Sequence, residues 1–180
     1  MKDISDRNLL TVVESFEVSR RLVELSKNHI PIEGSKTLLD IHKYIFQDIY
    51  QWAGEKRTVN ISKQDNPFFP ITSFDTGFSH IDTLIRDYRK LDATDIPAVS
   101  HTLAVILDSI NYLHPFREGN GRTQREFLRV LALEKGYPLD LSPSDNENIY
   151  KRYMSGTIDG DIEKLTKLIQ ELLIESDGTN

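Results

Sequence analysis

The stretch HPFREGNGRTQR, residues 114–125, decides how the rest of the chain is arranged. An apolar helical run should end at about Leu113, because a residue that precedes a proline is pushed out of the helical region, and we expect His114 to be extended. Gly119 and Gly121 permit a tight turn that a ligand can approach closely. A second helical pattern follows, and its first amide groups lack helical partners and favour an anion. The stretch therefore predicts an anion-binding loop between two helices.

Three arginines follow this loop along one face of the second predicted helix. Arg122 and Arg125 are three residues apart, and helical side chains lean toward the N-terminus, so both guanidinium groups should reach back over the loop. Arg129 extends the row. One alternative is a solvated face on which Glu126 pairs with Arg122 and Arg129. The Gly-Asn-Gly turn ahead of the helix favours phosphate binding instead.

His114 and Glu118 add the groups that phosphate chemistry needs. The ordinary pKa of an imidazole, about 6.5, suits a base that takes a proton at neutral pH, although a histidine at a helix end is more often structural. Glu118 can hold a Mg²⁺ ion whose other ligands are waters and phosphate oxygens. A base, a metal carboxylate and a phosphate loop together indicate nucleotidyl or phosphoryl transfer to a hydroxyl.

The same residues carry a family resemblance. HPFREGNGR with Thr123, Gln124 and Arg125 matches in full the motif His-x-Phe-x-(Asp/Glu)-Gly-Asn-Gly-Arg-x-x-Arg of Fic-domain proteins, and residues 38–57, LLDIHKYIFQDIYQWAGEKR, resemble the lead-in helix of that family. The resemblance runs from about residue 34 to the final helix. It implies a protein adenylyltransferase, which transfers AMP from ATP to a Tyr, Ser or Thr hydroxyl of another protein.

The resemblance also implies roles for individual residues. His114 resembles the general base, Glu118 the ligand of Mg²⁺, with ATP as co-substrate, and Phe116 the residue that fixes the loop from below. The nucleotide-binding groups of the family correspond to Gly119, Asn120, Gly121, Arg122 and Arg125.

Composition limits the other possibilities. At 180 residues the chain is most simply one domain, 1–180, with its core at about 34–175. The absence of cysteine excludes disulfides and suits a reducing compartment, so we expect a cytoplasmic protein. The net charge of −6 argues against a nucleic-acid partner. Residues 1–30 contain no secretory signal, and the uncharged stretch Ile96–Leu107 is too short to span a membrane.

The spacing of apolar residues predicts an all-α fold of six to eight helices. The expected helices cover residues 7–27, 35–52, 73–91, 98–113, the motif helix up to about 136, 144–153 and 161–174, with Thr94 or Asp95 as the cap of the fourth. We interpret His42 as structural and Trp52 as an anchor of the core. Tyr150 and Tyr153 either pack in the core, which is the more common role, or line an adenine pocket.

Residues 57–69 change from helical to strand periodicity. Val59 and Ile61 alternate with polar residues, which predicts a strand, and residues 64–67 then form a turn. Periodicity alone indicates only a surface hairpin. The resemblance implies a flap that aligns a segment of the target protein by main-chain pairing, with Lys63 and Gln64 where the flap meets the nucleotide.

Two alternatives to adenylyl transfer remain open. The Doc-type kinase branch of the family has Lys where this chain has Gly121, which favours transfer of AMP over transfer of phosphate, whereas the motif does not distinguish phosphocholine transfer. A helical interaction module that only binds nucleotide is the other alternative. The intact His114 and Glu118 argue against it, because binding alone needs no base.

The sequence also bears on how the activity would be inhibited. Fic proteins are commonly inhibited by a helix with the pattern (Ser/Thr)-x-x-x-Glu-(Gly/Asn), whose glutamate pairs with the arginine that corresponds to Arg125. No Ser or Thr of this chain has Glu four residues later; the nearest match, Ser155 to Asp159-Gly160, reads as an inter-helix turn. We therefore expect a small antitoxin to supply the glutamate helix. Short Fic proteins of this type resemble bacterial toxins that modify DNA gyrase and topoisomerase IV.

Overall fold

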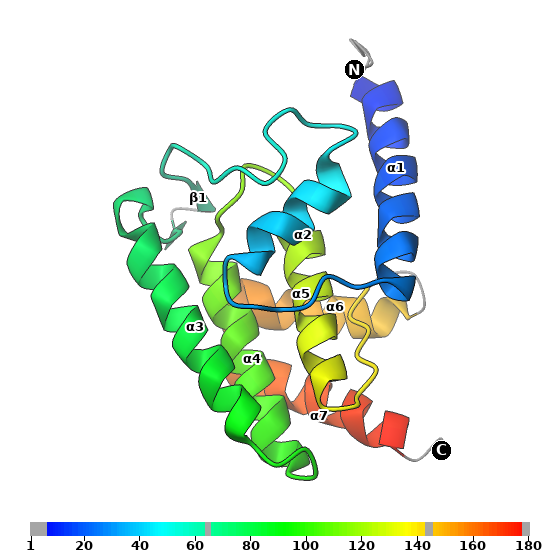
Figure 1. Cartoon of the computed structure of the whole chain (residues 1–180), viewed down its shortest axis with the longest axis vertical. Coiled ribbons are helices and arrows are strands. Elements are labelled where there is room, and N and C mark those ends of the chain that lie inside the picture. Colours follow the sequence, from blue (N-terminus) through cyan, green and yellow to red (C-terminus); the bar gives the residue numbers. More distant parts are fainter. Residues whose placement is uncertain (1–6, 64–65, 143–145, 178–180) are drawn as a thin grey trace.

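The computed structural model describes residues 7–63, 66–142 and 146–177, which form seven α-helices and one small hairpin (Figure 1). The predicted all-α fold is confirmed. The elements are α1 (Arg7–Lys27), α2 (Thr37–Phe46), β1 (Ser62–Lys63), β2 (Asn66–Pro67), a 3-10 turn (Ile71–Ser73), α3 (Phe74–Lys90), α4 (Ile96–Leu113), α5 (Asn120–Glu134), α6 (Glu147–Asp159) and α7 (Ile162–Asp177). In this described part, no helix is long and apolar enough to cross a membrane.

Helix α4 is the central element of the bundle. It packs against α3, α5 and α7 (Figure 1). Its start follows the predicted signals, because the Asp95 side chain accepts a hydrogen bond from the Ala98 amide and Pro97 lies in the first turn. The apolar stripe expected from the sequence is buried, with side chains no more than 2% exposed at Val99, Leu103, Ile106, Leu107 and Ile110.

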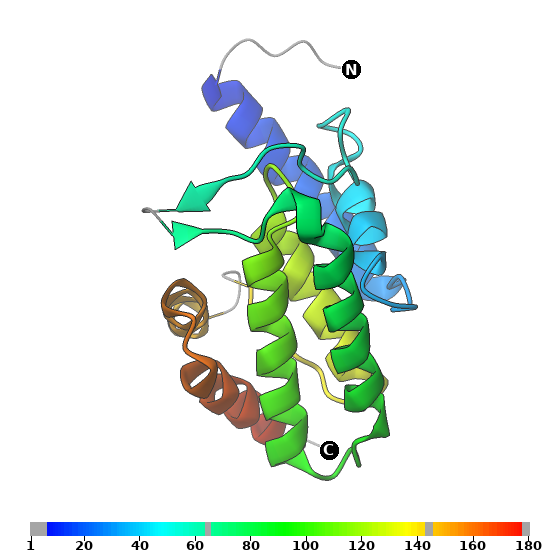
Figure 2. The same cartoon turned by 90° about the vertical axis from the view of Figure 1, so that its left-hand side faces the viewer.

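The hairpin and the loop between α4 and α5 lie at the same end of the bundle (Figure 2). Helix α2 packs against α5, and α1 packs against α2. In the hairpin, Ser62 pairs with Pro67 and Lys63 with Asn66 in antiparallel register. The predicted turn over residues 64–67 was therefore too long, because Asn66 and Pro67 belong to the return strand; Gln64 lies outside the described residues.

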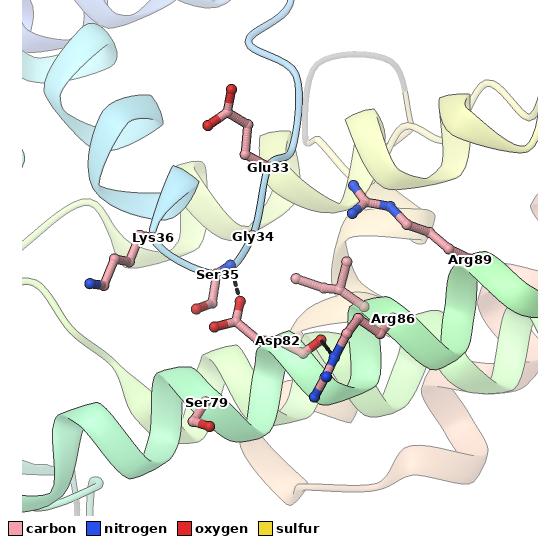
Figure 3. Close-up of a pocket in the computed structure, with 9 residues that line it drawn as sticks. Glu33, Gly34, Ser35, Lys36, Ser79, Asp82, Arg86 and Arg89 are labelled. Atoms are coloured by element: carbon pink, nitrogen blue, oxygen red, sulfur yellow. Dashed lines mark hydrogen bonds between the residues drawn. The ribbon is translucent and has the colours of Figure 1, made fainter.

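The start of α2 is fixed by a contact with α3. The Ser35 amide donates a hydrogen bond to the Asp82 carboxylate at 2.6 Å (Figure 3). This contact borders a pocket of about 570 Å³ that contains none of the motif residues and has side chains of both charges, at Glu33, Lys36, Asp82, Arg86 and Arg89.

Two predicted helix ends differ from the structure by six residues each. Helix α2 ends at Phe46 instead of continuing to residue 52, because the chain turns back so that the Gly54 amide reaches Nδ1 of His42 at 2.8 Å. Trp52 is consequently half-buried, stacked on Tyr50 at 4.3 Å, and does not anchor the core. Helix α6 runs on to Asp159, beyond the expected end at residue 153.

Candidate active site

His114 lies at the end of α4 in an unusual backbone conformation. The helix ends at Leu113 as predicted, but His114 is left-handed, with φ 41° and ψ 61°, and is not extended. Its amide still donates to the Ile110 carbonyl at 3.0 Å. A left-handed non-glycine residue costs about 1–3 kcal/mol and persists only where its surroundings hold it. One contact that holds it is with Arg57, whose Nε donates to the His114 carbonyl at 2.8 Å.

The imidazole of His114 is oriented as a base. Its Nδ1 lies 3.2 Å from the Asn111 carbonyl, which can only accept, so Nδ1 carries the proton and Nε2 has the free lone pair. Burial of the imidazole is the largest reason that its pKa lies below 6.5, and the positive charges of Arg57 and Lys63 lower this pKa further. The Phe68 ring covers it, with ring centroids 3.9 Å apart. At neutral pH the imidazole is therefore uncharged and able to accept a proton.

Asn120 holds the loop in shape through its side chain. Its Nδ2 donates to the Phe116 carbonyl at 2.9 Å, and its Oδ1 accepts from the Phe116 amide at 3.0 Å. Phe116 is 1% exposed and stacks on His42 at 3.8 Å, which places it beneath the loop as the resemblance implied. Both polar atoms of the Asn120 side chain are thus used within the loop. A role of Asn120 in nucleotide binding stays a prediction, and falls on its backbone amide.

His42 ties the loop to the end of the lead-in segment. Its Nδ1 accepts from the Gly54 amide at 2.8 Å, so Nε2 carries the proton and donates to the Glu118 carbonyl at 3.0 Å. The side chain is fully buried, and burial lowers its pKa to about 4. The expectation that His42 is structural is confirmed.

Gly119 opens α5 in a position that only glycine fits. Its φ is 82°, and a Cβ atom there would lie 2.4 Å from the ring of Phe46. The first helical hydrogen bond runs from the Thr123 amide to the Gly119 carbonyl at 3.1 Å. The helix therefore does not use the amides of residues 120–122, which match the predicted anion-binding groups.

Glu118 is exposed beside these amides, with 60% of its side chain accessible. Its Oε1 accepts from the Gly119 amide at 2.9 Å and lies 3.5 Å from Nη2 of Arg122. Within residues 7–63, 66–142 and 146–177, no cluster of three His, Asp or Glu side chains could hold a metal by itself. An exposed carboxylate, engaged through Oε1 only among the described residues, beside amides that the helix does not use fits Mg²⁺, which prefers a few protein oxygens completed by waters and phosphate.

The two motif arginines have different partners. Nη1 of Arg122 lies 2.7 Å from the Glu14 carboxylate of α1, and the second oxygen of Glu14 accepts from the Tyr50 hydroxyl at 2.7 Å. Arg125 forms no ion pair with another described residue and lies over the rings of Tyr150, at 5.5 Å, and Tyr153, at 5.4 Å. Arg125 thus has its charge available for a ligand, whereas Arg122 already has a carboxylate partner.

The solvated-face alternative for these arginines was only partly correct. Glu126 pairs with Arg129 at 2.8 Å, as that alternative stated, but Arg122 pairs with Glu14 and Glu118 instead.

Comparison with known proteins agrees with this geometry. Residues 31–132 match the model of the Fic/DOC family. The chain belongs to the Fic/DOC family. It is 33% identical over 176 residues to the protein adenylyltransferase VbhT of Bartonella schoenbuchensis, an alignment that covers 96% of this chain and 36% of VbhT. It is 30% identical over 145 residues to the probable protein adenylyltransferase Fic of Escherichia coli, with 81% of this chain and 72% of that protein covered.

Solved structures show the same fold. The N-terminal FIC domain of Bep8 from Bartonella sp. 1-1C matches with a TM-score of 0.80 at 22% identity, over 95% of this chain and 88% of that one. The BepC protein of Bartonella tribocorum, solved with bound AMPPNP, matches with a TM-score of 0.77 at 19% identity, over 94% and 88% of the two chains. This Fic/DOC chain spans about a third of the length of VbhT, 36%.

The tyrosines of α6 differ in burial although both rings face Arg125, and an adenine pocket lined by either stays a prediction. Tyr153 is 1% exposed and its hydroxyl accepts a hydrogen bond from Nε2 of Gln124 at 2.6 Å, so it belongs to the core. Tyr150 is half-buried and presents its ring to Arg125.

Three residues of the site were missed from the sequence. Glu14 pairs with Arg122, Phe68 covers His114, and Arg57 holds the His114 carbonyl. No short-range pattern marks any of them, since each acts through a contact with a distant part of the chain. Of the two hairpin residues that were predicted to meet the nucleotide, Lys63 is exposed on β1 and acts on the pKa of His114. Gln64 lies outside the described residues.

Proposed function

We propose that this Fic protein transfers AMP from ATP to a hydroxyl group of a target protein. The observation that carries the proposal is the lone pair on Nε2 of His114, together with the amides of residues 120–122 that α5 does not use and with Arg125, which has no ion-pair partner among the described residues. A neutral imidazole next to an anion-binding helix end suits attack of a hydroxyl on a phosphate. VbhT is named a protein adenylyltransferase and the Escherichia coli relative a probable protein adenylyltransferase, and these names support the same activity.

In the proposed reaction, the hydroxyl oxygen of the target forms a bond to the α-phosphorus of ATP. Nε2 of His114 takes the hydroxyl proton, and the bond from the α-phosphorus to the bridging oxygen of the β-phosphate breaks, so that pyrophosphate leaves. The amides of residues 120–122 and the guanidinium of Arg125 bind the phosphates. Glu118 would hold Mg²⁺, which supplies positive charge to the leaving pyrophosphate.

The transferred group is identified by labelling. The protein is incubated with a cell lysate, Mg²⁺ and ATP labelled on either the α- or the γ-phosphate. Adenylyl transfer places only the α-label on protein, and mass spectrometry then finds AMP on a Tyr, Ser or Thr residue. Transfer of the γ-label means phosphorylation, and no transfer of either label to any lysate protein contradicts the proposal. A His80→Ala variant serves as the matched control, because His80 is an exposed histidine of α3 outside the site.

We also propose that the hairpin docks the target by adding a strand. The described sheet has two strands, so β1 keeps an outer edge, and its residues Ser62 and Lys63 are both exposed. Main-chain pairing at such an edge gives affinity with little dependence on side chains. Ile61→Pro should therefore reduce modification of protein targets far more than Ser62→Ala. Equal activity of these two variants, at equal ATP affinity, would remove strand addition from the proposal.

Inhibition in trans by a small antitoxin is part of the same proposal. The segment Ser155–Asp159 is the last turn of α6 and not the expected inter-helix turn, and Asp159 pairs with Lys164 at 2.9 Å, away from Arg125. Arg125 is thus left for a glutamate from another chain. DNA gyrase and topoisomerase IV are the first targets to test. Expression of this chain in a bacterial host should arrest growth, and the His114→Ala variant should not; equal growth in a host whose gyrase is modified by the purified protein would contradict the toxin role.

A further inference from the structure

One buried arginine joins the end of α4 to the hairpin. Arg57 is 2% exposed. Its Nε donates to the His114 carbonyl at 2.8 Å, and its Nη2 lies 3.4 Å from the Leu113 carbonyl. The last carbonyls of a helix have no partners within it, so the guanidinium closes the end of α4. The backbone amide of Arg57 also donates to the Pro115 carbonyl at 2.7 Å. Arg57 therefore contacts three consecutive carbonyls, those of residues 113, 114 and 115, around the left-handed turn of His114.

The same guanidinium holds both legs of the hairpin. Nη1 of Arg57 donates to the Val59 carbonyl at 2.7 Å, and Nη2 donates to the Phe69 carbonyl at 2.5 Å. Val59 precedes β1 and Phe69 follows β2. An isolated two-stranded hairpin is marginally stable, and strands of two residues are shorter still. The position of this hairpin over His114 thus depends on contacts from outside it.

The charge of Arg57 has no carboxylate partner among the described residues. Its guanidinium carbon lies 4.8 Å from the centre of the Phe74 ring, and its hydrogen-bond partners are all backbone carbonyls. A planar fork of donors can bind carbonyls in several directions at once, which a lysine ammonium on a flexible stem does not reproduce. Burying a charge without a charged partner costs free energy, so a cation is an unfavourable choice for fixing a turn unless its charge also has a role in the site.

We propose that Arg57 is a positioning residue for adenylyl transfer, which fixes the left-handed turn of His114 and the hairpin above it as one unit. A target segment docked on the hairpin then has its hydroxyl group at a fixed position relative to the imidazole of His114. The inference rests on the proposed function. In addition, burial is the largest cause of the lowered pKa of His114, and the charges of Arg57 and Lys63 lower this pKa further, while Glu118 opposes them.

Two substitutions separate the fork from the charge. Arg57→Lys keeps the charge and loses the fork, whereas Arg57→Gln loses both. Both variants should lower the rate of AMP transfer to a protein target by about 10–100-fold, because small errors in the position of reacting groups have effects of this size. The Kd for ATP should change by less than about twofold, since the guanidinium of Arg57 contacts carbonyls of α4 and the hairpin and not the amides of residues 120–122 or Arg125. Only Arg57→Gln removes the positive charge that opposes protonation of His114. This variant alone should therefore raise the pKa of His114, measured by NMR, and shift the acidic limb of the pH–rate profile to higher pH. Arg86→Gln, an exposed arginine of α3, is the control.

A wild-type rate for folded Arg57→Lys, or a loss of ATP affinity that matches the loss of rate, would overturn the proposal. Hydrogen exchange of the wild-type protein tests it without any variant. The Phe68 amide, bonded to the Ile61 carbonyl within the hairpin, and the His114 amide should exchange with protection factors within about threefold of each other if they open as one unit. Exchange of Phe68 more than about 100-fold faster would mean that the two parts are independent. This readout also separates a failure of the Arg57 inference from a failure of the proposed activity, because it requires no transfer.

Discussion

His42 makes the stability of the catalytic loop depend on pH. Its neutral imidazole accepts from the Gly54 amide and donates to the Glu118 carbonyl, and burial lowers its pKa from 6.5 to about 4. Between these two values the unfolded chain binds a proton at this site and the folded chain does not. Stability from this group is therefore complete above pH 6.5 and is lost as the pH falls toward about 4.

The size of the effect follows from the shift. A change of about 2.5 pKa units corresponds to about 3 kcal/mol in full, and to about 2 kcal/mol between pH 7.5 and pH 5. The assay is urea unfolding at these two pH values. The free energy of unfolding of the wild type should fall by about 2 kcal/mol more than that of His42→Gln, in which the titrating group is absent. Since other titrating groups are common to both proteins, their contributions cancel in this difference.

His80→Gln, at an exposed histidine of α3 away from the loop, is the matched control variant. The reasoning fails if wild type and His42→Gln lose the same stability between the two pH values, or if acidification stabilises the wild type relative to the variant.

Two further predictions concern α5 and its partners. Gly119→Ala should destabilise the protein by about 2–4 kcal/mol in urea unfolding, because the new Cβ clashes with Phe46 and the backbone is left-handed. Gly136 is also left-handed but has no atom near its Cβ position, so Gly136→Ala should cost only about 1–2 kcal/mol. Equal losses of stability in the two variants would mean that the clash with Phe46 does not contribute. Glu14→Gln removes the carboxylate that competes for Arg122, so the Kd for ATP measured by calorimetry should fall by about two- to fivefold, and a rise would mean that Glu14 positions Arg122 for the nucleotide.

The parts of the fold that sequence predicted well depend on local signals. Pro115 ends α4 and Gly119 opens α5, because their effects on the backbone act at the residue itself or its neighbour. The buried apolar face of α4 was equally predictable, since the spacing of its apolar residues depends on that helix alone. The motif likewise placed His114, Glu118 and Arg125 on one loop and helix end.

The parts that failed depend on contacts between distant segments. A residue before proline is expected to be extended, but His114 is left-handed, and its carbonyl accepts a hydrogen bond from Arg57, 57 residues away. Apolar spacing continued past Phe46, but the bond between Gly54 and His42 turned the chain back. Local patterns report preferences of a segment, and the tertiary contacts that override them have no short-range signature.

The central claim is that His114 acts as the base while the helix end binds the nucleotide. The most direct test is His114→Ala, measured both by transfer of α-labelled AMP to protein and by calorimetric titration with ATP in the presence of Mg²⁺. Transfer should fall by about 10²–10⁴-fold while the Kd for ATP stays nearly unchanged. Transfer at the wild-type rate would remove His114 from the mechanism, and a parallel loss of ATP binding would contradict the separation of binding from catalysis.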